Sequence, residues 1–91
     1  MELKKLEDAI KLIIIQHLNL EANYFSRFSA DGNNLLFYKD LAYDMLDRFE
    51  ILEKIEEKLN IIITDENLIW DNNITLGNYI KLIYNIYEHK M

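Results

Sequence analysis

Apolar residues recur every three or four positions along three long stretches of this 91-residue chain. The first stretch carries Leu3, Leu6, Ile10, Ile13, Ile14 and Leu18; the second Leu46, Phe49, Leu52, Ile55 and Leu59; the third Leu76, Tyr79, Ile80, Ile83 and Ile86. This spacing is typical of amphipathic helices, which bury one apolar face. Because the chain contains no proline and only two glycines, we expect three uninterrupted helices.

The segments between these stretches contain residues that begin helices and form turns. Residues 29–34 are dense in turn formers, and Glu21–Phe28 is expected to hold a short helical turn. Asp44 and Thr75 are suited to N-cap the second and third long helices, and a short helix is expected over Glu66–Ile69. The sequence therefore predicts a single all-α domain over residues 1–91, a four-helix bundle with a short third helix.

The charge and composition limit the class of partner and the compartment. A net charge of −6 argues against a nucleic-acid partner, which requires clustered Lys and Arg, and favours a protein partner with a basic surface. The alternative is that the acidity only confers solubility. The chain lacks cysteine, a signal-peptide pattern and any apolar run of about 18 residues. We therefore expect a cytoplasmic protein that does not contact a membrane.

The segment from Phe37 to Asp47 resembles a motif of acyl carrier proteins. It reads F-Y-K-D-L-A-Y-D-M-L-D here, against F-x-x-D-L-G-x-D-S-L-D in the family. Downstream segments match the family in order and in most of their spacing: 49–59 resembles V-E-L-V-x-x-L-E-E-x-F, 63–66 resembles I-P-D-E, and 75–80 resembles T-V-G-D-L-V. The resemblance implies an acyl-carrier-protein-like four-helix bundle, with a first loop longer than usual.

Met45 stands where this resemblance places the family's serine, which carries a phosphopantetheine arm through its hydroxyl. A thioether has no oxygen that could form the phosphodiester. The other serines, Ser26 and Ser29, lie in the first loop, outside the motif. We therefore expect a chain that carries no phosphopantetheine and needs no other cofactor.

No group of residues predicts an enzyme or a metal site. His17 and His89 are far apart in the sequence, and we interpret each as a structural or surface histidine. Trp70 is interpreted as a packing anchor in the core or at its rim. No nucleophile paired with a base is evident, so we expect no catalytic activity.

The resemblance also implies docking on partner proteins through acidic residues of the second helix. The candidate partner-binding residues are Asp40, Asp44, Met45, Asp47, Glu50, Glu53 and Glu57. Met45 would supply an apolar contact at the centre of this acidic face. In the alternative interpretation, Met45 packs inward and the acids form a solvated helix face.

These observations support two hypotheses of function. The first is a non-catalytic acidic binding module, for example an immunity protein that neutralises a basic toxin such as a nuclease, because colicin immunity proteins are small, acidic, cysteine-poor and similar in topology. The alternative is an acyl carrier protein homologue that acts as a docking partner in fatty-acid or polyketide-type acyl transfer pathways. Both hypotheses require a protein partner with a basic surface.

Overall fold

The computed structural model describes residues 1–21, 33–42 and 44–89, and its described part is mostly helical. Four α-helices follow in order: α1 (Leu3–Leu18), α3 (Met45–Leu59), the short α4 (Asn67–Trp70) and α5 (Leu76–Glu88). The all-α prediction and the place of the short helix are confirmed. An additional π-helical turn, η2 (Phe37–Leu41), precedes α3 and was not predicted. The turn expected over 21–28 falls almost wholly outside the described residues.

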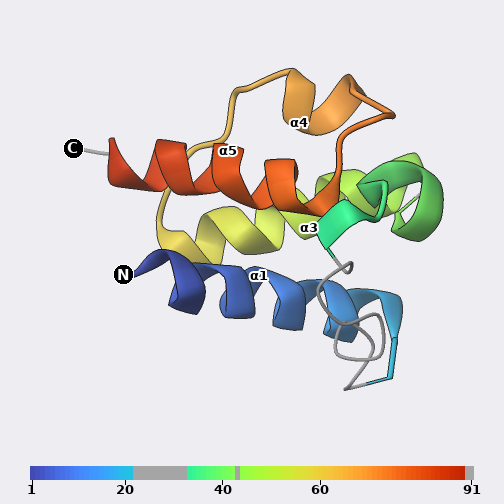
Figure 1. Cartoon of the computed structure of the whole chain (residues 1–91), viewed down its shortest axis with the longest axis horizontal. Coiled ribbons are helices and arrows are strands. Elements are labelled where there is room, and N and C mark those ends of the chain that lie inside the picture. The colour runs from blue at the N-terminus through green and yellow to red at the C-terminus, as the bar shows by residue number, and fades with distance from the viewer. Residues whose placement is uncertain (22–32, 43, 90–91) are drawn as a thin grey trace.

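The three long helices lie side by side, and α4 lies over one edge of them (Figure 1). Helix α1 packs against both α3 and α5, and the chain runs through α1 in the direction opposite to the other two. The end of α1 therefore lies beside the start of α3. Among the described residues, no helix combines the length and apolar character needed to cross a membrane.

Local signals explain where the helices begin and end. The Thr75 hydroxyl accepts a hydrogen bond from the Asn78 backbone N–H at 3.1 Å, which confirms the predicted cap of α5. Helices α1 and α3 both end at an asparagine with a left-handed backbone, Asn19 with φ of 56° and Asn60 with φ of 54°. Asparagine tolerates this conformation better than most residues, so it is suited to terminate a helix.

The predicted apolar stripes form most of the core. Leu6, Ile10 and Ile14 of α1 are fully buried, as are Tyr79 and Ile83 of α5. The expectation was wrong for three residues at the starts of helices, which are exposed: Leu3 at 40%, Leu46 at 63% and Phe49 at 44%. In α3 the buried face is centred on residues 51, 52 and 55, and helical spacing turns residues 46 and 49 away from it.

A cluster of three aromatic rings joins η2 to α5 in the core. Phe37 stacks on Tyr79 with 4.2 Å between ring centroids, and Tyr38 meets the edge of Phe37 at 4.9 Å. Backbone hydrogen bonds accompany this contact, because Phe37 N–H donates to Ile74 O at 2.9 Å and Leu76 N–H donates to Leu35 O at 2.8 Å. The segment before α3 is therefore fixed to the start of α5.

The tyrosine hydroxyls in this cluster are buried, and no described residue hydrogen-bonds to them. Burial raises the pKa of Tyr79 well above its usual value, because the charged phenolate would lose its hydration. Burial also raises the pKa of Tyr38, although the nearby Arg48 cation partly opposes the shift. Both rings therefore remain neutral at physiological pH and act as packing groups.

We expect Phe37→Ala to destabilise the fold by about 3–5 kcal/mol, because it removes a fully buried ring and leaves a cavity. Phe49→Ala, the matched change at a half-exposed ring, should cost less than about 1.5 kcal/mol. Urea denaturation followed by circular dichroism measures both values. Equal losses for the two variants would contradict the assignment of the core.

Candidate functional site

Helix α3 begins after an N-cap residue, and its first residue, Met45, lies at the surface. Asp44 accepts a hydrogen bond from the Leu46 backbone N–H at 2.9 Å, which confirms the predicted N-cap. Met45 is the first residue of α3 and is 39% exposed. Its side chain is therefore available at the surface and is not packed fully inward.

The residues at this terminus do not fit a phosphopantetheine group. From 44 to 49 the described side chains offer two carboxylates, a thioether, a guanidinium group and two apolar groups, but no hydroxyl. The phosphodiester of the prosthetic group requires a hydroxyl oxygen. Ser26 and Ser29 lie outside the described residues.

Four exposed apolar side chains gather where α3 begins and α4 lies beside it. We call this set the apolar patch: Met45, Leu46, Phe49 and Trp70. Trp70 is 58% exposed, and its ring meets Phe49 edge to face with 6.4 Å between centroids. Trp70 thus lies at the rim, one of the two positions that the sequence suggested. Exposed aromatic pairs of this kind supply binding energy at protein interfaces.

The predicted acidic residues divide into two groups by what they contact. Asp40 accepts a hydrogen bond from the Leu36 backbone N–H at 2.8 Å, Asp44 caps α3, and Asp47 and Glu50 face a histidine of α1. Glu53 and Glu57 are exposed and form no ion pair with any described residue. Asp40 and Asp44 thus stabilise local backbone, whereas Glu53 and Glu57 remain open to a partner.

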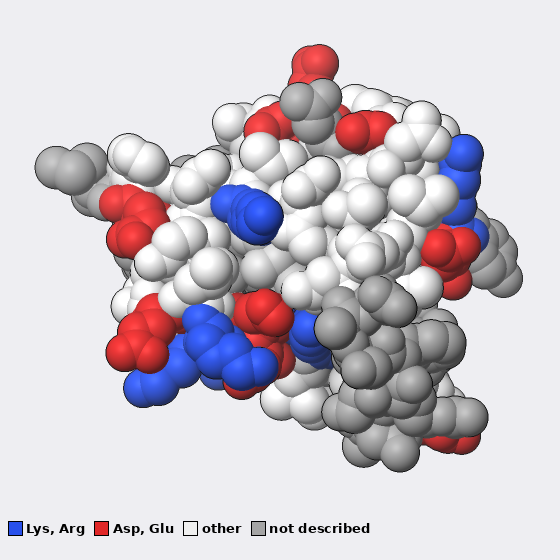
Figure 2. Space-filling model, viewed as in Figure 1, with Lys and Arg blue, Asp and Glu red and all other residues white. Residues whose placement is uncertain are grey.

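Glu53 and Glu57 continue the surface of the apolar patch along the helix. Residues 46, 50, 53 and 57 follow each other at intervals of four, three and four, so they share one face of α3. We call Glu50, Glu53 and Glu57 the acidic row. The charged residues of α1 differ from the acidic row, because they pair with each other. Lys4 pairs with Asp8 at 3.2 Å, and Lys11 pairs with Glu7 at 3.3 Å. Figure 2 shows such opposite charges side by side along its lower left edge, over α1.

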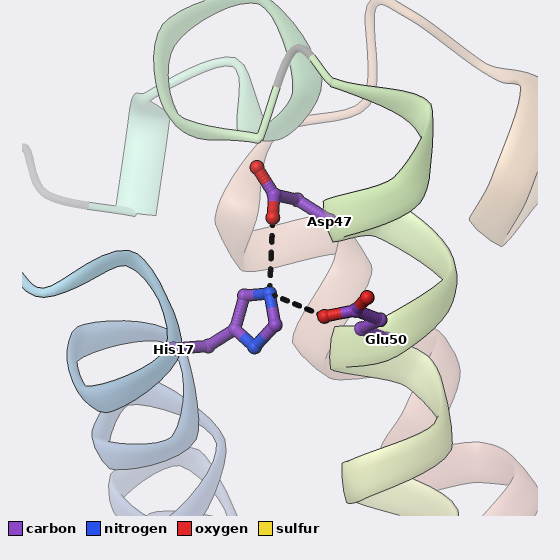
Figure 3. A group of neighbouring side chains, drawn as sticks. All are labelled: His17, Asp47 and Glu50. Carbon is purple, nitrogen blue, oxygen red and sulfur yellow. Dashed lines mark hydrogen bonds and ion pairs between the residues drawn. The ribbon is translucent and has the colours of Figure 1, made fainter.

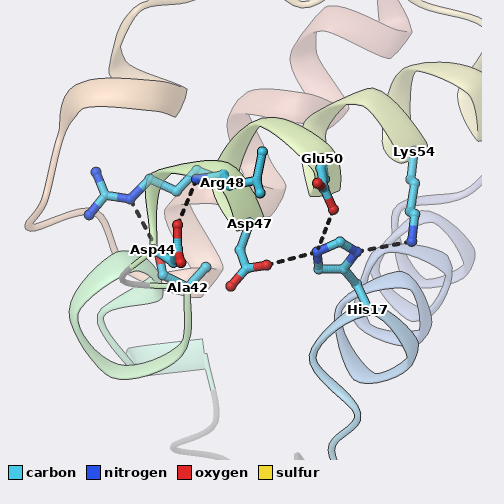
Figure 4. A network of polar contacts seen from close by, with 8 residues as sticks. His17, Ala42, Asp44, Asp47, Arg48, Glu50 and Lys54 are labelled. Carbon is cyan, nitrogen blue, oxygen red and sulfur yellow. Dashed lines mark hydrogen bonds and ion pairs between the residues drawn. The ribbon is translucent and has the colours of Figure 1, made fainter.

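His17, at the end of α1, contacts two acids of α3 (Figure 3). Its Nε2 lies 3.0 Å from Asp47 Oδ1 and 3.3 Å from Glu50 Oε2. On the other side of the ring, Lys54 Nζ lies 2.9 Å from His17 Nδ1 (Figure 4). These contacts were not predicted from the sequence, where His17 was interpreted as a structural or surface histidine, because its partners lie 30 or more positions away in the chain.

Arg48 is a second polar residue whose role was not predicted. It is only 8% exposed, and its Nε donates to Ala42 O at 3.1 Å. Its guanidinium carbon lies 4.2 Å from the centroid of the Tyr38 ring, a cation–π contact. Figure 4 shows this group pointing away from His17, toward the short helix α4. Arg48 therefore joins α3 to η2 and to the residue that follows it.

Comparison with known proteins identifies the family. The chain is 36% identical over 78 residues to the acyl carrier protein of Chlamydia caviae, covering 86% of this chain and 91% of the relative. The acyl carrier protein of Chlamydia felis is also 36% identical over 78 residues, with 86% and 90% covered. That of Helicobacter pylori is 32% identical over 74 residues, with 81% and 85% covered. The chain belongs to the acyl carrier protein family.

Membership of the acyl carrier protein family confirms the resemblance drawn from the motifs between Phe37 and Ile80. No family model matches the chain, and no solved structure matches it. The relatives are named as carriers, which agrees with the expectation that this chain is not a catalyst. None of these three names describes a toxin inhibitor, so the immunity hypothesis gains no support and stays a prediction.

Proposed function

We propose that this chain is a docking protein of acyl transfer pathways, an acyl carrier protein homologue that binds a pathway enzyme without a prosthetic group. The observation that carries the proposal is the exposed apolar patch where α3 begins, continued along the same helix face by Glu53 and Glu57, which form no ion pair with any described residue. The family relationship supplies the class of partner. The role of a docking partner in acyl transfer is therefore preferred over that of a toxin inhibitor.

The apolar patch would supply most of the affinity. Leu46 and Trp70 are more than half exposed, and large apolar and aromatic side chains gain free energy when a partner removes them from water. The backbone of the patch is already ordered, because its residues stand on helices, and Phe49 contacts Trp70. Little backbone conformational entropy is therefore lost on binding.

The acidic row would steer the encounter and set the orientation of the complex. Exposed charges contribute more to the rate of association than to final affinity, and their effect decreases as salt screens them. Glu53 and Glu57 form no ion pair with any described residue. A partner with a basic rim around an apolar pocket fits this surface.

Met45 makes the proposed role one of docking rather than carriage. Its thioether cannot receive phosphopantetheine, while the exposed side chain adds to the apolar patch. The acids and apolar residues around it would still present a carrier-type surface to an enzyme. The chain would occupy or recruit an enzyme of the pathway without delivering an acyl group.

The wild-type chain should gain no mass when incubated with coenzyme A and a broad-specificity phosphopantetheinyl transferase, because no hydroxyl is offered at α3. Met45→Ser should gain the phosphopantetheine adduct, since the surrounding carrier-type surface is retained. Intact-mass spectrometry reads both results. An adduct on the wild type would overturn the loss of carriage, and an unmodified Met45→Ser chain would count against a carrier-type surface.

The double variant Glu53→Lys/Glu57→Lys should slow association with a purified phosphopantetheinyl transferase by about tenfold or more at low salt, because steering charges are reversed. Stopped-flow or surface-plasmon measurements give this rate. The difference from wild type should shrink as ionic strength rises. These two residues are better targets than Asp47 and Glu50, which also contact His17.

The matched control is Glu2→Lys/Asp8→Lys, which makes the same change in net charge at exposed positions near the start of α1. It should reduce the association rate far less than the α3 double variant. Equal effects of the two double variants would mean that net charge, rather than the acidic row, governs binding.

Trp70→Ala should weaken binding to the same transferase by about 2 kcal/mol or more, as expected for an aromatic hot spot. Ile62→Ala is the control, because Ile62 is 78% exposed and does not belong to the apolar patch. Isothermal titration calorimetry gives both affinities. A loss for Ile62→Ala as large as that for Trp70→Ala would remove the patch from the proposed interface.

A further inference from the structure

One imidazole and two carboxylates from different helices converge where α1 meets α3 (Figure 3). The ligand-type atoms of His17, Asp47 and Glu50 all lie within 4.8 Å of one another. The His17 Nε2 distances to the two carboxylates are 3.0 and 3.3 Å. In a tetrahedral zinc site, bonds of about 2.0–2.1 Å place the ligand atoms about 3.3–3.4 Å apart. The two measured distances already approach that spacing.

The single ring N–H of His17 cannot fully serve both carboxylates of this cluster. Lys54 Nζ lies 2.9 Å from His17 Nδ1, so Nδ1 is the acceptor and the neutral ring carries its single N–H on Nε2. That one N–H faces both Asp47 and Glu50. A second proton on Nδ1 would place an N–H group against the Lys54 ammonium. Two anions therefore share one hydrogen, and a doubly charged cation would satisfy both of them.

The burial of the three side chains suits a bound ion. The side chain of His17 is 8% exposed, so the nitrogen ligand is held in place by the contact between helices. The side chains of Asp47 and Glu50 are 36% and 44% exposed. Solvent therefore reaches the carboxylates, which leaves room for entry of an ion and for water as a further ligand.

We propose that His17, Asp47 and Glu50 bind a divalent transition-metal ion such as Zn²⁺, which links the end of α1 to the start of α3. The imidazole nitrogen favours zinc and its neighbours in the periodic table over Mg²⁺ or Ca²⁺, which prefer oxygen ligands alone. This site goes beyond the proposed docking function and does not depend on it. Metal binding and enzyme docking are measured separately, so either can fail without the other.

Lys54 gives the proposal a distinctive consequence. A metal on His17 Nε2 moves the ring proton to Nδ1, where it meets the Lys54 ammonium. Lys54 is exposed, so its side chain can move into solvent. The free energy needed for this movement lowers the affinity for the metal. Removing the lysine should therefore strengthen metal binding, even though Lys54 is not itself a ligand.

The test is a titration of metal-free wild-type chain, carrying ¹⁵N-labelled histidine, with Zn²⁺ alone, followed by NMR and by calorimetry. We expect one ion per chain, with the ring signals of His17 shifting strongly. His89 is an internal control, because it lies at the other end of the chain and contacts the backbone of its own helix. Mg²⁺ at the same concentrations should leave the His17 signals unchanged.

Variants identify the ligands. His17→Gln and Glu50→Gln should each weaken Zn²⁺ binding by about tenfold or more, because each removes a ligand and even outer-shell losses cost about 10–100-fold. The control Glu53→Gln removes an equal charge from the same helix outside the cluster and should change the affinity by less than about twofold. Lys54→Met should tighten binding. Zn²⁺ should also raise the melting temperature of the wild type more than that of Glu50→Gln.

Several results would overturn the proposal. Equal shifts of His17 and His89 with Zn²⁺ would indicate non-specific histidine binding. Unchanged affinity in both His17→Gln and Glu50→Gln would place any bound ion elsewhere. If His17→Gln fails to fold, Glu50→Gln and Lys54→Met still decide the matter. Weaker binding by Lys54→Met would contradict the competition between lysine and metal.

Discussion

The attachment of the segment before α3 to the start of α5 is the contact on which the functional surface depends. Phe37 stacks on Tyr79 in the core, and two backbone hydrogen bonds join residues 35–37 to residues 74–76. The burial of these rings fixes the turn η2, which in turn fixes the first residue of α3. Arg48 adds a bond from inside α3 to the carbonyl of Ala42. The position of Met45 at the surface follows from these contacts.

Because its amino end is anchored in this way, α3 can present three faces with different roles. Its buried face, around Ile51 and Ile55, holds the bundle together. Its outer face carries the acidic row and three of the four residues of the apolar patch, the fourth being Trp70 of α4. On the edge next to α1, Asp47 and Glu50 meet His17. A stretch of acids that looks uniform in the sequence is thus divided among caps, a helix contact and free surface.

Most of the fold could be predicted from the sequence because its determinants are local. Helical spacing of apolar residues and the caps at Asp44 and Thr75 act over a few positions, and both predicted caps are present. The π-helical turn η2 could not be predicted, because it depends on burying Phe37 and Tyr38 against α5. The exposure of Leu46 and Phe49 was also missed, because only packing decides which side of a helix faces the core.

For the functional site, the sequence by itself determined the family, the missing serine at position 45 and the acids of α3, since motif order and residue chemistry are properties of the chain. Only the tertiary structure decided which acids remain free, because that depends on which side chains of α1 lie opposite them. It brought His17 from 30 positions away to Asp47, and placed Trp70 beside Phe49. Contacts between helices distant in sequence arise from packing, and no local pattern encodes them.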